Sequence, residues 1–143
     1  MDKSLIDLII DLKRNCLADE QQIRTICNIS LAEYKGITEM DIEEQIPCNV
    51  LAKKMGLSPS RGSRVIDNLV RKGYLLRKTH PRDRRSFIVS LSSKGIKIKK
   101  RIERERSNCE SRIKKSLTDQ EIELIKESLE LITKIFNQNS LDI

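Results

Sequence analysis

The chain has few of the residues on which catalytic and metal-binding sites depend. It contains a single histidine, no tryptophan and, in 143 residues, only two tyrosines and two phenylalanines. The histidine, His80, stands beside Pro81 in a predicted turn, and no glycine-rich phosphate-binding loop follows a predicted strand. We therefore expect neither an enzyme nor a bound metal or cofactor. Because only 3% of the residues are aromatic, we expect a core of leucine, isoleucine and valine in a mainly α-helical protein.

Paired cysteines are also lacking. The four cysteines are Cys16, Cys27, Cys48 and Cys109, and none belongs to a Cys-x-x-Cys motif, which argues against a zinc ribbon or a thioredoxin-like site. On one continuous helix, Cys16 and Cys27 would lie about 16 Å apart, because each residue advances the helix by ~1.5 Å, so they could not share one ion. Free cysteines are often buried, and small apolar packing residues are their ordinary interpretation.

Nothing in the sequence predicts a membrane span or a signal peptide. The apolar stretch at residues 5–12 is too short for a bilayer, which needs about 20 residues, and Asp7 and Asp11 interrupt it. The chain also starts with acidic rather than basic character, unlike a signal peptide. We therefore expect a cytoplasmic protein.

Positive charge is concentrated in the middle of the chain. The formal net charge is +7, yet residues 1–50 hold five basic and ten acidic side chains, and residues 116–143 hold two and six. Residues 51–115 hold twenty-one basic side chains against five acidic ones. A basic centre between acidic ends favours a polyanion bound to one part of the molecule, since counterion release would drive most of the affinity.

The basic region contains one short helix with its own start and stop signals. Ser58 is a favourable N-cap, Pro59 fits the first helical position, and Gly73 can close the helix in a left-handed conformation. One face is apolar, whereas another carries arginine and asparagine, the residue types that read guanine and adenine in a major groove. The pattern predicts a DNA recognition helix. The apolar face holds Val65, Ile66, Leu69 and Val70, and the other face holds Arg61, Arg64, Asn68 and Arg71.

The flanking segments complete a winged helix-turn-helix. Residues 50–57 provide a shorter helix and a glycine-containing turn before the recognition helix. Two strands follow at residues 74–78 and 86–91, and the tip between them, residues 79–85, carries three arginines. The residues expected to face the recognition helix are Leu51, Ala52 and Met55, and those expected on one side of the second strand are Phe87, Val89 and Leu91.

Several short motifs of this region match one known family. They are Leu51-Ala52 with Leu57-Ser58, Ser63-Arg64 with Gly73-Tyr74-Leu75, and above all Asp83-Arg84-Arg85-Ser86. In these motifs the chain resembles the MarR family of bacterial transcription regulators. In that family the wing motif is Asp-x-Arg, in which the acid braces an arginine that enters the minor groove; the matching positions are Asp83 and Arg85. An arginine in a narrow minor groove gains from the negative potential there, and a nearby carboxylate can orient its guanidinium. The residues expected to contact DNA are Ser58, Ser60, Arg61, Ser63, Arg64, Asn68, Arg82, Asp83, Arg84 and Arg85.

Two capping boxes mark further helix starts. In each, a hydroxyl is followed three residues later by a carboxylate: Ser30 with Glu33, and Thr118 with Glu121. The first pair predicts a helix beginning at Leu31, and the second predicts the final helix. A long basic helix is expected between them, from residue 92 to about 115. The residues expected to point inward from the helix at Leu31 are Leu31, Tyr34, Ile37 and Met40.

The outer helices are expected to form a dimer. The first helix should run from Ser4 to about Cys27, although a fresh start at Asp19 would divide it, and the sequence leaves one or two helices open. The final helix has eight apolar residues at helical spacing, and burying them would contribute on the order of 10 kcal/mol, at ~1.5–3 kcal/mol each. In the MarR family the first helix joins the last two to make the dimer. The residues expected at this interface are Leu5, Leu8, Ile9, Leu12, Ile122, Ile125, Leu129, Ile132 and Phe136.

We thus expect a single MarR-like domain, mainly α-helical with a small β-hairpin wing. Residues 30–92 would bind double-stranded DNA, and residues 1–29 and 93–143 would form the homodimer. Two recognition helices would read a roughly palindromic operator with half-sites about one helical turn, ~34 Å, apart. The resemblance implies a repressor released by a small-molecule effector or a redox signal.

Two alternatives stay open. One is a regulator that responds to oxidants or metals through its cysteines; some MarR-family members sense peroxides through a cysteine near the first helix, and Cys16 is the nearest candidate. The other is a winged helix that serves as a protein-interaction module, with its arginines meeting an acidic partner. A steep, linear fall of log affinity with log salt would favour the DNA-binding interpretation.

Overall fold

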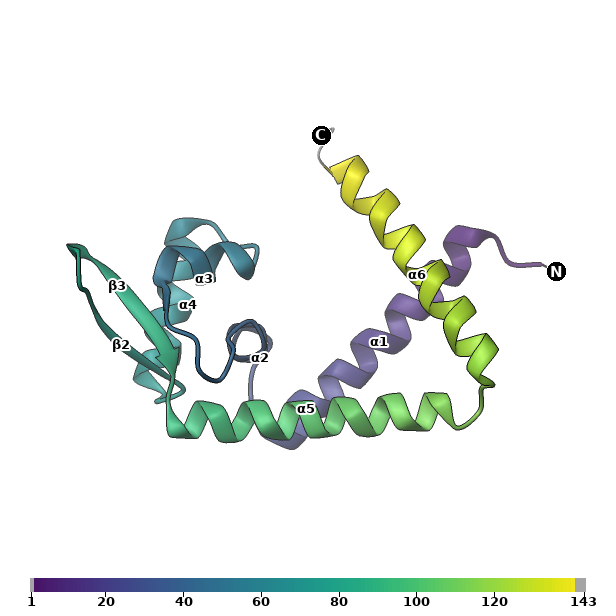
Figure 1. Cartoon of the computed structure of the whole chain (residues 1–143), viewed down its shortest axis with the longest axis horizontal. Coiled ribbons are helices and arrows are strands. Elements are labelled where there is room, and N and C mark those ends of the chain that lie inside the picture. Colours follow the sequence, from purple (N-terminus) through teal and green to yellow (C-terminus); the bar gives the residue numbers. More distant parts are fainter. Residues whose placement is uncertain (1, 141–143) are drawn as a thin grey trace. The chain divides into compact units, whose positions relative to one another are not determined.

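The computed structural model describes residues 2–140, and it has the predicted winged helix-turn-helix with long helices on either side (Figure 1). The chain divides into two compact units, one extending to Glu105 and the other beginning at Arg106. The elements are α1 (Leu5–Cys27), α2 (Leu31–Thr38), β1 (Ile46–Pro47), α3 (Cys48–Lys54), α4 (Pro59–Arg71), β2 (Leu75–His80), β3 (Asp83–Leu91), α5 (Ser93–Lys114) and α6 (Asp119–Ser140).

The first helix, α1, is continuous over its 23 residues, which answers the question that the sequence left open. It begins with a capping box in which the Ser4 hydroxyl accepts from the Asp7 N–H at 3.1 Å and the Asp7 carboxylate accepts from the Ser4 N–H at 3.3 Å. It ends at Asn28, which adopts a left-handed conformation with φ 55°. No helix break occurs at Asp19, so Cys16 and Cys27 lie eleven residues apart on one helix.

Helix α2 begins at Leu31 as predicted, but only half of its expected capping box forms. The Ser30 hydroxyl accepts from the Glu33 N–H at 3.1 Å. The Glu33 side chain is 3% exposed and accepts instead from the Lys72 amine at the end of α4. The prediction that Leu31 points inward is wrong, because it is 41% exposed, whereas Ile37 and Met40 are fully buried and Tyr34 is half-buried.

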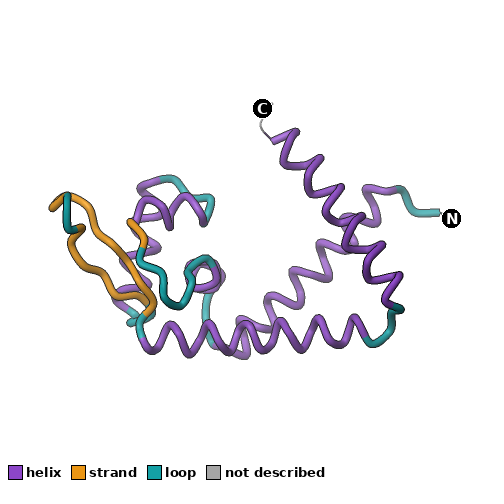
Figure 2. Tube along the Cα trace, in the orientation of Figure 1, coloured by secondary structure: helices purple, strands orange, loops and turns teal. Residues whose placement is uncertain are grey.

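The sheet has three antiparallel strands in the order β1-β3-β2, one more than predicted (Figure 2). The additional strand pairs Ile46 with Val89 and Pro47 with Ile88. The wing strands are also longer than expected, since β2 reaches His80 and β3 begins at Asp83. The predicted tip of residues 79–85 is therefore reduced to a two-residue turn at positions 81–82.

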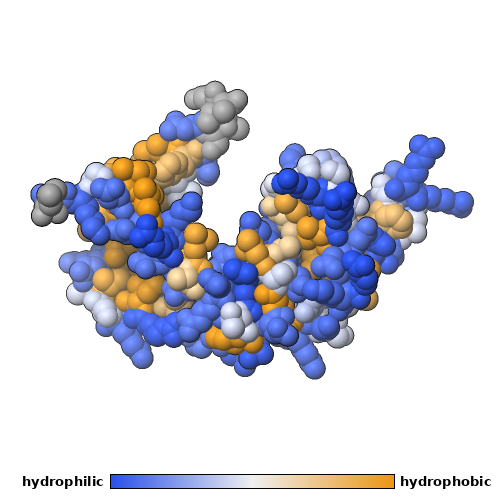
Figure 3. All heavy atoms as spheres, turned by 180° about the vertical axis from the view of Figure 1, so that it is seen from behind, coloured by the Kyte–Doolittle hydropathy of each residue, from blue (hydrophilic) through white to orange (hydrophobic). Residues whose placement is uncertain are grey.

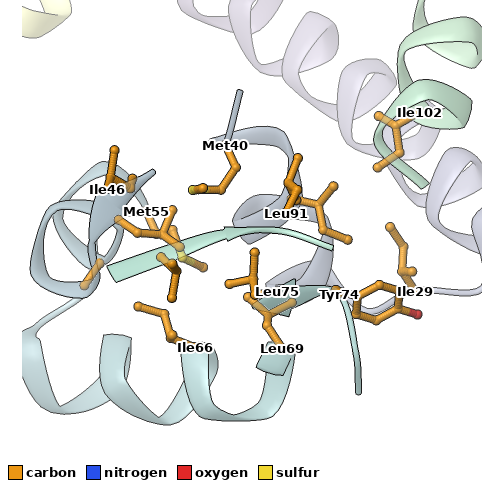
Figure 4. Packing of buried hydrophobic residues seen from close by; sticks show 14 of the residues in the cluster. Ile29, Met40, Ile46, Met55, Ile66, Leu69, Tyr74, Leu75, Leu91 and Ile102 are labelled. Atoms are coloured by element: carbon orange, nitrogen blue, oxygen red, sulfur yellow. The ribbon is translucent and has the colours of Figure 1, made fainter. Parts of the chain in front are cut away.

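The core of the first unit lies between the helices of the helix-turn-helix and the sheet. Figure 4 shows Ile66 and Leu69 of α4 pointing toward Met55 and Leu75, the packing that the apolar face of this helix predicts. Phe87 was expected to join Val89 and Leu91 on the inner side of β3, but it is 43% exposed because the wing extends beyond the core. The buried apolar residues are Ile23, Cys27, Ile29, Ile37, Met40, Ile46, Leu51, Ala52, Met55, Ile66, Leu69, Tyr74, Leu75, Val89, Leu91 and Ile102.

Helix α5 is attached to the first unit by its N-terminal half. Its cap is Ser92, whose hydroxyl accepts from the Gly95 N–H at 3.0 Å. Ile102 is fully buried, and the buried Lys99 amine donates to the backbone carbonyls of Thr38 and Met40, just beyond the last turn of α2. Lys99 therefore satisfies carbonyl groups that the end of a helix leaves unpaired.

The second unit contains the end of α5 and the whole of α6. The predicted capping box is present: the Glu121 N–H donates to the Thr118 hydroxyl at 3.1 Å, and the Thr118 N–H donates to the Glu121 carboxylate at 2.9 Å. The helix extends to Ser140, and the expected dimer region at residues 141–143 lies outside the described residues.

Candidate nucleic-acid interface

The N-terminal end of α4 presents two free guanidinium groups. The Ser58 hydroxyl accepts from the Arg61 N–H at 3.3 Å, and Pro59 occupies the first turn, as the sequence predicts. Arg61 and Arg64 are exposed, and neither has a hydrogen-bond or ion-pair partner within residues 2–140. Their charges are therefore free to meet an anionic ligand.

The position of α4 depends on a close contact with α3. A Cβ atom at Gly62 would lie 2.2 Å from Ala52 Cβ and 3.2 Å from Ala52 Cα, so only glycine fits where these two helices cross. The turn between them contains Gly56 with φ +70°, and the chain leaves α4 through Gly73 with φ +85°. The contact fixes the α4 N-terminus against α3.

A groove of about 590 Å³ separates this end of α4 from the wing. Its walls come from α3, α4, β2 and β3, so the groove brings the predicted DNA contacts Ser63 and Arg85 to one place although they lie 22 residues apart. The lining residues are Cys48, Asn49, Ala52, Pro59, Ser63, Ile66, Asp67, Arg77, Arg85, Ser86 and Phe87.

A bulge in the wing places Arg85 at this groove. Residues 84–86 have no paired partner in β2, since the register passes from Thr79 opposite Phe87 to His80 opposite Asp83. The Asp83 carboxylate accepts from the Arg85 backbone N–H at 3.0 Å and from the Ser86 hydroxyl at 3.1 Å. Asp83 thus stabilises the bulge, which re-aims the side chain that follows it.

The contact that Asp83 makes differs from the expected one, in which the carboxylate orients the arginine guanidinium. The carboxylate holds the backbone of Arg85 rather than its side chain, because the bulge leaves an N–H group that needs an acceptor. The Arg85 guanidinium has no partner among the described residues. It therefore stays available for an anion in the groove.

An ion pair that the sequence did not reveal joins the wing to α4. The Arg77 guanidinium on β2 donates to the Asp67 carboxylate on α4 and lies 5.0 Å from the centre of the Phe87 ring. Arginine stacked on an aromatic ring in this way keeps its fork oriented. Arg77 is therefore a positioning residue whose charge is compensated by Asp67.

Asn68 does not lie with the other predicted contacts. It is half-buried in the C-terminal half of α4, it does not line the groove, and its side-chain oxygen accepts from Arg71 at 3.2 Å. Arg82 and Arg84 are exposed on the wing but do not line the groove either. The groove itself therefore gathers Ser63 and Arg85 from the predicted set, while Ser58, Ser60, Arg61 and Arg64 are exposed at the same end of α4.

Comparison with known proteins agrees with this arrangement. A sequence model of the MarR family matches residues 29–87, the segment that runs from the start of α2 to the bulge of the wing. Residues 29–87 therefore form a segment that matches the MarR family. That family consists of transcriptional regulators rather than enzymes.

Several similar proteins match this chain over most of its length. It is 24% identical over 111 residues to an uncharacterised HTH-type transcriptional regulator of Mycobacterium leprae, ML2140, covering 78% of each chain. The fold is similar to that of Streptococcus pneumoniae FabT in complex with DNA, with a TM-score of 0.83, 20% identity and coverage of 94% of this chain and 96% of that one. It is also similar to Mycobacterium tuberculosis RV1404, with a TM-score of 0.79, 21% identity and coverage of 94% and 95%.

The four cysteines differ in how far they are exposed to solvent. Cys16 is exposed on α1, Cys27 is buried, and Cys48 and Cys109 are half-buried. Burial raises the pKa of the Cys27 and Cys48 thiols, which disfavours the reactive thiolate at neutral pH. Within residues 2–140, no three metal-binding side chains gather at one point, and no helix is long and apolar enough to cross a membrane.

Most of the predicted dimer residues are exposed on this single chain. On α1 they are exposed except for the half-buried Ile9, and on α6 Ile122 and Ile132 are half-buried. Leu5 is 69% exposed, an unusual position for a large aliphatic side chain. The exposed predicted residues are Leu5, Leu8, Leu12, Ile125, Leu129 and Phe136.

Proposed function

We propose that this protein is a dimeric, sequence-specific regulator that binds double-stranded DNA through the N-terminal end of α4 and the wing. We call Ser58, Ser60, Arg61, Ser63, Arg64 and Arg85 the reading surface. The observation that carries the proposal is the groove, which brings Ser63 of α4 and Arg85 of the wing together beside two unpaired arginines. The match of residues 29–87 to the MarR family and the fold shared with a protein solved in complex with DNA support it.

The two arginine groups have different tasks in this proposal. Arg64 projects from the exposed face of α4, where its guanidinium can donate two hydrogen bonds to the O6 and N7 atoms of guanine in a major groove. Arg85 sits on the wing, which would follow the sugar-phosphate backbone into the neighbouring minor groove, where negative potential is highest if the groove is narrow. Arg77 keeps these two parts in register through its bond to Asp67.

The dimer is proposed from the exposed apolar faces of α1 and α6. Figure 3 shows hydrophobic side chains along the surface of α6, and thirteen of the eighteen exposed large hydrophobic residues of the described chain lie on α1 and α6. Each such residue stabilises an interface by about 1.5–3 kcal/mol when it is fully buried. A second copy of the chain would cover these faces and place two reading surfaces about 34 Å apart.

The proposed regulator acts as a repressor of a promoter that contains a pseudo-palindromic operator. Residues 30–92 would form the DNA-binding region, and residues 1–29 and 93–143 the dimerisation region. A small-molecule effector or a redox signal would release the operator. Cys16 is the proposed thiol for a redox signal, because it alone of the four is exposed.

The test separates base reading from phosphate contact. An operator is first selected from a pool of random duplexes, and wild type, Arg64→Ala and Arg85→Ala are titrated against it and against random duplex at several salt concentrations. Arg64→Ala is expected to lose about 1–3 kcal/mol of discrimination between the two duplexes. Arg85→Ala is expected to weaken operator binding. Lys35→Ala, which changes an exposed residue on α2, should alter neither the operator affinity nor the discrimination between the two duplexes.

Two results would overturn the proposal. If no sequence is enriched from the pool, the protein does not read bases. If both arginine variants bind the selected operator as tightly as wild type does, the reading surface is not the DNA contact. An equal loss by Arg64→Ala on operator and random duplex would assign Arg64 to phosphate instead of a base.

A further inference from the structure

The first half of α5 carries a row of exposed basic side chains. Lys97, Lys100, Arg101 and Arg104 are all exposed, and none has a hydrogen-bond or ion-pair partner in the part of the chain that the structure describes. We call these four residues the α5 basic face. In Figure 3, hydrophilic side chains project from the lower edge of the molecule, where α5 runs.

Other lysines of the same helix have clear structural roles. Lys99 is buried and donates to the carbonyl groups of Thr38 and Met40. Lys94 donates to the Lys72 carbonyl at 2.8 Å. The α5 basic face lies on the other side of the helix from Lys99 and the buried Ile102, since each residue turns an α-helix by about 100°.

The spacing of the α5 basic face is unfavourable for the helix itself. Its members stand three or four residues apart, the distance at which like charges on a helix repel each other. Within this row the neighbours are like charges, whereas acidic side chains stand at its edges: Glu103 lies 3.9 Å from the Lys99 amine, and Glu105 follows Arg101 by four residues. A bound polyanion would relieve this repulsion.

The α5 basic face is remote from the reading surface. Helix α5 starts beside the C-terminal end of α4, where Lys94 contacts the carbonyl of Lys72. The reading surface lies at the opposite end of α4, about 20 Å away over 13 residues. The α5 basic face is therefore a surface separate from the reading surface.

We propose that the α5 basic face is a second, sequence-independent DNA-binding surface, which holds the phosphate backbone of a second duplex segment. The four side chains extend over ~10 Å of helix, which matches about three phosphates of one strand at ~3.4 Å per nucleotide along the axis. The face has no apolar anchor of the kind found at the centre of a protein interface, and no aromatic ring on which a base could stack. Its chemistry therefore fits a duplex backbone better than a protein or a single strand.

The first experiment measures the salt dependence of binding to a random 60-base-pair duplex. The test variant carries Lys97→Gln, Lys100→Gln and Arg104→Gln. The control carries Lys13→Gln, Arg14→Gln and Lys35→Gln, which removes three exposed positive charges from α1 and α2 instead. Sedimentation and circular dichroism check that both variants keep the wild-type assembly and fold.

The expected result is a smaller salt dependence for the test variant alone. Each phosphate contact contributes about −0.9 to the slope of log affinity against log salt, so the slope should become shallower by about 2 to 3. An unchanged slope, or the same change in the control, would overturn the proposal. Binding of polyglutamate that depends on the α5 basic face, without any such dependence for the duplex, would overturn it in favour of an acidic protein partner.

The second experiment asks whether the two surfaces hold two duplexes at once. An operator duplex, selected from a random pool and just long enough for two half-sites, is immobilised with bound protein, and a fluorescent random duplex is added. Wild type and control should retain the fluorescent duplex, whereas the test variant should bind the operator normally and retain several-fold less. Equal retention by all three proteins, or none by wild type, would contradict a second duplex.

The second experiment rests on the proposed function, because the reading surface must hold the first duplex. The two ideas can nevertheless fail separately. If no operator is enriched from the pool, the proposed function fails, while the salt slopes on random duplex still test the α5 basic face. If an operator is bound but the slopes of test and control variants agree, only the α5 basic face fails.

Discussion

The contact between α3 and α4 makes Gly62→Ala a sharp test of how the recognition helix is held. The added methyl group would lie 2.2 Å from Ala52 Cβ, against an ordinary contact distance of 3.4–4 Å, and the Ala52 Cα at 3.2 Å belongs to the backbone and cannot rotate away. The two helices would have to separate by more than 1 Å. We therefore expect α4 to shift relative to α3 and to the wing.

The size of the effect follows from two opposing contributions. Replacing glycine with alanine inside an exposed helix stabilises it by about 1 kcal/mol, whereas overpacking a tight contact costs about 1–3 kcal/mol. The free energy of unfolding should consequently fall, by up to about 2 kcal/mol. Operator affinity should fall as well, since Arg61 and Arg64 extend from the displaced end of the helix.

Urea denaturation followed by circular dichroism, at one fixed protein concentration, measures this change in the free energy of unfolding. Ser63→Ala is the matched control, because it is exposed on the next position of the same helix and adds no atom to the contact. Exchanging the two residues, as Ala52→Gly with Gly62→Ala, should restore much of the loss by removing the opposing methyl group. A gain of about 1 kcal/mol in Gly62→Ala alone, as in an exposed helix, would refute the close contact.

Three further predictions concern charged and ionisable groups. Lys72→Met should destabilise the fold by roughly 1–3 kcal/mol, more than Glu33→Gln, because it leaves a carboxylate that is 3% exposed without its partner. Adding Glu33→Gln to Lys72→Met should recover stability in urea denaturation. A double variant whose destabilisation is the sum of the two single effects would contradict this. Burial raises the pKa of the Cys27 thiol, so alkylation followed by mass spectrometry should label Cys16 first at pH 7. The free energy of unfolding should decline as pH rises above the ordinary thiol pKa of about 8.5. Equal labelling of the two cysteines would contradict the burial of Cys27. Hydrogen bonds at the α6 N-terminus lower the pKa of Glu121. The stability that these bonds contribute should be present above the ordinary carboxyl pKa and lost as pH falls through the lowered value. An NMR titration in which Glu121 has the ordinary carboxyl pKa would count against this capping box.

Local signals in the sequence predicted the recognition helix well. Ser58, Pro59 and Gly73 act on the backbone within one turn of the helix ends, so their effect does not depend on distant contacts. The apolar positions of α4 were likewise predictable, because helical spacing determines which side chains share a face. The exposed basic face at this end of α4 follows from these two features.

Contacts between distant segments were harder to predict. The two residues of β1 are too few for any periodic pattern, and they are recognisable only once β3 is in place. Glu33 has capping-box spacing, but its buried carboxylate accepts instead from the Lys72 amine, which is 39 residues away in the sequence. The Asp67 and Arg77 pair and the bulge at Asp83 also depend on strand register, which a single sequence does not specify.

The most direct test of the central claim is a hydroxyl-radical footprint of the protein on its selected operator. The account predicts protection on one face of the duplex at two major grooves about one helical turn, ~34 Å, apart, each flanked by a protected minor groove. Arg85→Ala should lose protection in the flanking minor grooves while the major-groove positions stay protected. A single protected segment, or a footprint that Arg85→Ala leaves unchanged, would contradict a dimer that reads DNA with α4 and the wing.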